Sequence, residues 1–134
     1  LHDCAKYIDC KTVEGFCVDE DVPEPVIHAF LGAYIAREHL GVDSEIEDAI
    51  RYHTSGKADM SLLSKLVFVA DMLEEGRSYE GVEKLRELYE KEDFERCFVE
   101  CLKEEFLHLM NKKQRIYVET INAYDYYVNK KRGE

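Results

Sequence analysis

Histidines and aspartates that could bind a metal ion are unevenly distributed along this sequence of 134 residues. His2 and Asp3 are adjacent, whereas His28 and His53 stand in or at the end of segments with helical apolar spacing. Asp71 stands in Leu-Val-Phe-Val-Ala-Asp-Met-Leu, the most apolar stretch of the chain. Because burying a lone carboxylate is costly, Asp71 must be neutral, paired or bound to a metal. Imidazoles combined with carboxylates favour a divalent transition metal such as iron or manganese.

Each of these residues also has a purely structural interpretation. Asp71 could form an ion pair with Lys65 or Arg77, or it could cap a helix. His28 could be a satisfied histidine of the core, and His53 could interact with the dipole at the C-terminus of a helix. Adjacent His and Asp residues are common in sequences. A metal centre therefore requires that the His-Asp pair and Asp71 converge on one ion.

The acidic composition argues against two classes of partner. Lys and Arg number 18 and Asp and Glu 29, so the net charge is −11, which repels nucleic-acid backbones and anionic lipid surfaces. The length and the 46% apolar content fit one globular domain over residues 1–134. No apolar run approaches the roughly 18–20 residues that span a bilayer. The five cysteines have no metal-type spacing and fit reduced thiols in a cytoplasmic protein.

The spacing of apolar residues predicts an all-α fold. Pro25 suits the first turn of a helix and Gly41 its end. Ser44 and Glu47 have the spacing of a capping box, and Ser61 is the expected cap of the next helix. Helices are expected over residues 24–40, 44–53, 62–75, 81–90, 94–111 and 118–130, and an exposed loop over 9–23.

Several motifs extend the pattern of the possible ligands. The chain opens with Leu-His-Asp-Cys-Ala-Lys and continues with Ile-His-Ala-Phe-Leu-Gly-Ala at 27–33 and Ala-Ile-Arg-Tyr-His-Thr-Ser-Gly at 49–56. Met-Ser-Leu at 60–62, Ala-Asp-Met-Leu-Glu-Glu-Gly-Arg at 70–77 and Gly-Val-Glu-Lys-Leu-Arg at 81–86 follow. Over nearly its whole length the sequence resembles the HD-domain metal phosphohydrolases, and within them the bacterial symmetrical bis(5'-nucleosyl)-tetraphosphatases.

This resemblance implies a bundle of helices around a metal site and hydrolysis of diadenosine tetraphosphate to two ADP. It implies one or two divalent ions, with iron expected and manganese or zinc as alternatives. By motif position, the implied metal ligands are His2, Asp3 and Asp71. Asp3 is also expected to accept a proton from the attacking water, and Lys6 to contribute a positive charge for catalysis. The residues expected to contact the substrate are Asp3, His28, His53, Thr54, Asp71, Arg77, Arg115, Ile116 and Tyr117.

Some alternatives remain open from the sequence. His28 and His53 could bind a second metal ion or donate to phosphate oxygens. The first metal-binding histidine of the family lies on a helix before the His-Asp pair, and we expect that helix to precede the sequence given. Another HD phosphohydrolase, acting on deoxynucleotides or on guanosine tetra- or pentaphosphate, and a non-catalytic helical module are the rival functions. A homodimer is a further expectation about partners.

Overall fold

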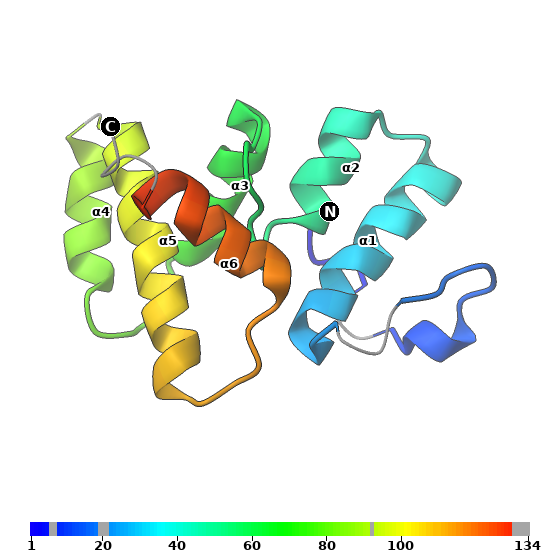
Figure 1. Cartoon of the computed structure of the whole chain (residues 1–134). Helices are drawn as coiled ribbons and strands as arrows, with labels where there is room; N and C mark the ends of the chain where they lie inside the picture. Colours follow the sequence, from blue (N-terminus) through cyan, green and yellow to red (C-terminus); the bar gives the residue numbers. More distant parts are fainter. Residues whose placement is uncertain (6–7, 19–21, 92, 130–134) are drawn as a thin grey trace.

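The computed structural model describes residues 1–5, 8–18, 22–91 and 93–129. This part of the chain contains six α-helices and no strand, so the prediction of an all-α fold is confirmed (Figure 1). A 3-10 turn precedes the first helix and a π-helical turn follows the last. The α-helices are α1 (Glu24–Leu40), α2 (Ser44–Arg51), α3 (Leu62–Met72), α4 (Val82–Glu90), α5 (Phe94–Asn111) and α6 (Val118–Tyr124).

The helix caps agree with the expected ones except at α2. Gly41 has a φ of 64°, and its N–H donates to the carbonyl of Ala36, which ends α1 as predicted. The N-cap of α2 is Asp43, whose carboxylate accepts from the N–H of Ile46 at 2.9 Å, so the expected cap at Ser44 is wrong. The carboxylate stands on extended backbone directly before the first helical residue, which is the geometry that capping requires.

Three helices end earlier than their apolar patterns predict, and one of them is α2, which stops at Arg51 instead of residue 53. α3 stops at Met72 instead of residue 75, because the hydroxyl of Tyr79 donates to the carbonyl of Met72 at 2.8 Å and replaces a further helical hydrogen bond. α6 stops at Tyr124 and continues as a π-helical turn over Asp125–Asn129. The last residue of the predicted segment, Lys130, lies outside the described residues.

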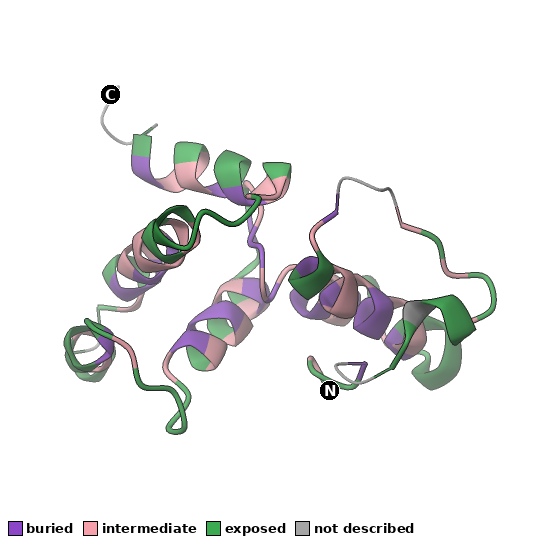
Figure 2. Cartoon of the chain, turned by 90° about the horizontal axis from the view of Figure 1, so that it is seen from below, coloured by how far each residue is buried: buried purple, intermediate pink, exposed green. Residues whose placement is uncertain are grey.

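The helices pack in two groups that meet at α3. α1 and α2 form one pair, and α4, α5 and α6 pack on the other side (Figure 1). Buried residues follow the inner faces of these helices, whereas the connecting loops are mostly exposed (Figure 2). In the described part of the chain, no helix combines the length and apolar character needed to cross a membrane.

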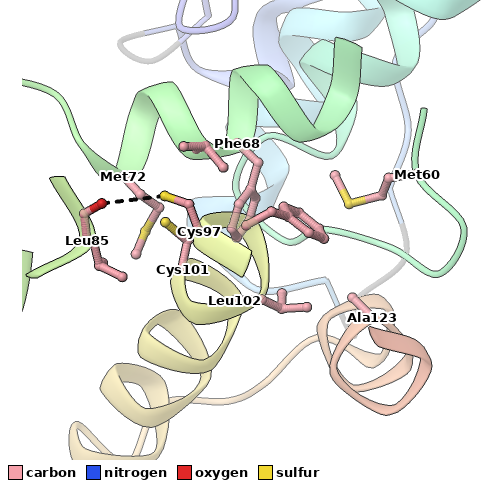
Figure 3. Packing of buried hydrophobic residues seen from close by; sticks show 10 residues of the cluster. Met60, Phe68, Met72, Leu85, Cys97, Cys101, Leu102 and Ala123 are labelled. Atoms are coloured by element: carbon pink, nitrogen blue, oxygen red, sulfur yellow. Dashed lines mark hydrogen bonds between the residues drawn. The ribbon is translucent and has the colours of Figure 1, made fainter. Parts of the chain in front are cut away.

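The larger hydrophobic cluster joins α3, α4, α5 and α6 (Figure 3). Phe68 and Phe98 are fully buried, with ring centroids 5.9 Å apart in an edge-to-face arrangement. Cys97 and Cys101 are free thiols buried as small apolar residues, and the thiol of Cys97 donates to the carbonyl of Leu85 at 3.5 Å (Figure 3). Burial raises the pKa of both thiols. This cluster fixes α3 against α5 and thereby sets the position of the last turn of α3.

Candidate metal centre

Four side chains meet where the N-terminal segment lies against the helices. His2 and Asp3 stand in the first turn of the chain, His53 directly after α2, and Asp71 in the last turn of α3. The approach of Asp71 to the His-Asp pair is the one that the resemblance implied.

The ligand atoms of His2, Asp3 and His53 all lie within 4.8 Å of one another, and Asp71 approaches this group through His2. His2 Nε2 lies 3.5 Å from Asp3 Oδ2 and 3.5 Å from Asp71 Oδ1. His53 Nε2 lies 3.3 Å from Asp3 Oδ1. Bonds of about 2.0–2.2 Å arranged tetrahedrally around one ion would separate neighbouring ligand atoms by about 3.3–3.6 Å. The side chains present therefore fit a divalent metal ion, and their mixed imidazole and carboxylate chemistry suits iron, manganese or zinc.

His53 is held in one orientation by the backbone. Its side chain is only 5% exposed, and its Nδ1 lies 2.6 Å from the carbonyl oxygen of Ile50. Because a carbonyl only accepts, Nδ1 donates to it, and this contact directs Nε2 toward Asp3. A histidine whose second nitrogen donates to a carbonyl is the usual arrangement at metal sites. The ring of His2 packs against it edge-to-face, with centroids 4.8 Å apart.

The two oxygens of Asp71 have different neighbours. Oδ1 faces His2, whereas Oδ2 accepts from Arg77 Nη2 at 3.0 Å. The ion pair expected from the sequence is thus present together with the approach to His2. Lys65, the other cation considered for Asp71, pairs with Glu95 at 3.1 Å. With 13% of its side chain exposed, Asp71 is the more buried of the two carboxylates in the group.

A cavity of about 410 Å³ surrounds this group. His28 on α1 and Thr54 after α2 line it, as the resemblance implied, together with Arg77. The three residues are therefore brought to the same cavity as the metal-binding atoms. Lys6, the remaining residue expected near the His-Asp pair, lies outside the described residues.

A second cavity, of about 180 Å³, adjoins the first and extends to the connection between α5 and α6. Thr54, Asp71 and Arg77 line both cavities, so the two share a wall beside His53 and Asp71. Arg115 and Tyr117, which were expected to contact the substrate, line the second cavity. Ile116, which stands between them in the chain, does not line it.

Among the residues of α5 that line this second cavity are two polar ones that the sequence analysis did not single out. They are Glu105 and His108, which lie one helical turn apart on one face of α5. Burial raises the pKa of the Glu105 carboxyl, and the nearby Arg77 opposes this effect. The three-residue spacing is the signal that could have paired them, but nothing local relates that face to the His-Asp pair.

The geometry is accompanied by similarity to known proteins. The family described as HD domain matches residues 1–76, which include all four side chains of the group. The chain belongs to the HD domain family. The HD segment thus contains every residue that approaches His2 and Asp3 in the group described above.

Relatives in this family extend the similarity beyond the HD segment. The chain is similar to the symmetrical bis(5'-nucleosyl)-tetraphosphatase of Bacillus subtilis, at 35% identity over 96% of this chain and 73% of that protein. The enzyme of the same name from Halalkalibacterium halodurans is 39% identical over 93% of this chain and 71% of that protein. A crystal structure described as a predicted HD superfamily hydrolase involved in NAD metabolism, from Clostridium acetobutylicum, superposes with a TM-score of 0.79. Its sequence is 27% identical, and the match covers 96% of this chain and 72% of that one.

Proposed function

We propose that this HD-domain chain hydrolyses diadenosine tetraphosphate symmetrically and releases two molecules of ADP. The observation that carries the proposal is the convergence of His2, Asp3 and Asp71, with atoms 3.5 Å apart, in a protein whose relatives are symmetrical tetraphosphatases. The rival interpretation, a non-catalytic helical module, gives no account of two histidines and two aspartates gathered beside one cavity.

The proposed metal ligands are His2, Asp3 and Asp71, and iron is the proposed metal. His53 completes the group because its Nε2 faces Asp3 and its other nitrogen is fixed by a carbonyl. A divalent metal bound there would make water more acidic and would polarise a phosphoryl oxygen. Whether His53 and His28 instead serve a second ion is decided by the metal stoichiometry of the purified protein.

Four side chains have proposed roles in proton transfer and in phosphate binding. The side chain of Asp3 is 48% exposed, so it can reach solvent and accept the proton of the attacking water. Arg77 uses one nitrogen for Asp71, and its other N–H groups can donate to phosphate oxygens. His28 and Thr54, which line the same cavity, add donors along the phosphate chain. These few donors offset the negative net charge of the protein locally.

The second cavity is the proposed site of one nucleoside. Its wall combines apolar side chains with the polar groups of the α5–α6 connection, which is typical of ligand sites. The ring of Tyr117 packs edge-to-face on Phe30, with centroids 5.8 Å apart, so its orientation is held before a base arrives. A base can stack on such a ring, and Arg115 beside it can contact the first phosphate.

The test is product analysis with the purified protein, loaded in turn with iron, manganese and zinc. We expect diadenosine tetraphosphate to yield ADP alone. AMP plus ATP, or no products with any of the three metals, would contradict the proposal. Parallel reactions with deoxynucleoside triphosphates and with guanosine tetraphosphate measure the rival activities, and we expect both to be slower. Elemental analysis of the same samples gives the number of ions per chain.

Two further expectations about the protein stay predictions. A homodimer is checked by light scattering across a range of protein concentrations. A cytoplasmic location is checked by fractionating cells that produce the protein at its natural level.

A further inference from the structure

The loop between α3 and α4 carries Arg77, and Arg77 has an unusual place in the molecule. It lines both cavities of the metal centre and also a third, of about 510 Å³, between α4 and α5. Its guanidinium bonds Asp71 on one side and faces the cavities on the other. A small displacement of the loop would therefore move a phosphate-binding group and a neighbour of the metal ligands at the same time.

Arg86, on α4, binds the backbone of this loop at three points. Its Nη2 donates to the carbonyl of Glu74 at 2.9 Å and to that of Arg77 at 3.1 Å, and its Nε donates to the carbonyl of Leu73 at 3.4 Å. Its Nη1 donates to the carboxylate of Glu83 at 2.7 Å, one turn earlier on α4. The side chain of Arg86 is 26% exposed, so most of it is covered by the loop that it binds.

These contacts close a small hydrogen-bonded ring. The N–H of Arg77 donates to the carbonyl of Glu74 at 2.9 Å, and the same carbonyl accepts from Arg86. The carbonyl of Leu73, the C-cap residue of α3, lies at the negative end of the helix dipole, which favours a cation. A planar guanidinium can serve several such acceptors at once, which the single ammonium of lysine cannot do with the same geometry.

We propose that Arg86 is a positioning residue for the reaction: it holds the loop backbone so that the guanidinium of Arg77 reaches the phosphates. The inference rests on the proposed function, because Arg86 faces the loop and acts only through Arg77. It assigns a role to the last residue of the 81–86 motif, which the metal centre itself does not use. Arg77, held in this way, would bind the polyphosphate chain of the substrate.

The experiment is a double-mutant cycle on the full chain, with diadenosine tetraphosphate as substrate. We compare wild type, R86K, R77A and R86K/R77A, with R96A as the matched control because Arg96 is an exposed arginine on α5. We expect R86K to lower kcat/KM by about 10- to 100-fold, the range for residues one shell from a metal site, mainly through KM. In the R77A background the same change is expected to have no effect. R96A is expected to match wild type.

R86A is included to remove the side chain altogether, and R86K serves alone if R86A does not fold. Equal losses from R86K with and without Arg77 would overturn the inference, because they would mean that Arg86 acts through general stability. R86K kinetics equal to those of R96A would overturn it as well. If wild type releases no ADP from this substrate, the proposed function itself fails, and that outcome is separate from the other two.

Discussion

His2 Nε2 lies 3.5 Å from Asp71 Oδ1, although the two residues stand near opposite ends of the HD segment 1–76. Asp71 is held there by α3, whose inner face packs on α5, and by its bond to Arg77. His2 is brought there by the N-terminal turn, where the thiol of Cys4 contacts the carbonyl of Gly32 on α1 at 3.8 Å. The proposed metal centre thus depends on packing between distant segments.

Replacing Asp71 with asparagine tests this relationship directly. D71N keeps an oxygen that can accept from Arg77 but loses the charge needed by a metal ligand. We expect bound metal and kcat/KM to fall by at least about 10- to 100-fold, the range known for residues one step further from a metal. Elemental analysis and ADP release measure the two effects. E87Q, on the exposed face of α4, is the control, and unchanged metal content in D71N would contradict the assignment of Asp71 as a ligand.

The end of α5 contains a residue in a costly backbone conformation. Lys113 has a φ of 53°, and the N–H groups of Lys113 and Gln114 donate to the carbonyls of Met110 and Leu109, which is a Schellman motif. Glycine adopts this conformation without a Cβ clash, so K113G is expected to stabilise the protein by about 1 kcal/mol. Urea denaturation measures the change.

The neighbouring residue provides the control for this prediction. Lys112 has an ordinary φ of −81°, so K112G is expected to destabilise the protein by about 0.5–1 kcal/mol. Equal effects of the two glycines would show that backbone strain at position 113 is not what limits stability.

Thr120 links α6 to the turn that follows His53. Its buried hydroxyl donates to the carbonyl of Ser55 at 2.8 Å. T120V keeps the shape of the side chain but leaves this buried carbonyl without its partner, which is expected to cost about 1–3 kcal/mol of unfolding free energy. T120S retains the hydroxyl and is expected to cost less. Thermal unfolding of the two variants compares their losses of stability. A larger loss of stability in T120S than in T120V would show that the methyl group of Thr120, and not its hydroxyl, is what stabilises the protein.

Glu105 makes stability depend on pH. Burial raises the pKa of its carboxyl, so the folded state holds the proton to higher pH than the unfolded chain does. The stability contributed by the protonated form is complete below the usual glutamate pKa of about 4.3 and is lost as pH rises through the folded value. E105Q is therefore expected to unfold at higher temperature than wild type at pH 7, with a difference that shrinks toward pH 4. A difference in unfolding temperature that grows toward acid pH would contradict a raised pKa of Glu105 in the folded state.

Tyr79 is expected to make the protein less stable at alkaline pH, because its pKa, like that of Glu105, is raised in the folded state. Burial raises its pKa to about 12, and its hydroxyl donates to the carbonyl of Met72. Since an unfolded tyrosine ionises near pH 10, wild type is expected to lose stability between about pH 10 and 12, by up to about 1.4 kcal/mol per pH unit for this group. Y79F lacks the ionisable group and is expected to show a shallower loss over that interval in denaturation curves. An unchanged slope would assign the alkaline loss to other groups.

The sequence by itself determined the elements and the type of chemistry. Helices α1 and α5 begin and end where the apolar spacing and the cap residues predict, because capping and periodicity depend on neighbours along the chain. The motifs around His2, Asp3 and Asp71 were sufficient to indicate a metal phosphohydrolase, and the HD domain similarity bears out that prediction. The helix caps, the apolar spacing and the motifs can all be recognised from residues that are neighbours along the chain.

Only the tertiary structure decided how the side chains are used. The ring of His53 is oriented by the carbonyl of Ile50, and the backbone of Arg77 is bound by Arg86, which no spacing rule relates to it. Glu105 reaches the second cavity only because α5 packs on α3. Such contacts arise when loops bring distant segments together, and their geometry depends on the packing of whole helices, which a single sequence does not encode in any local pattern.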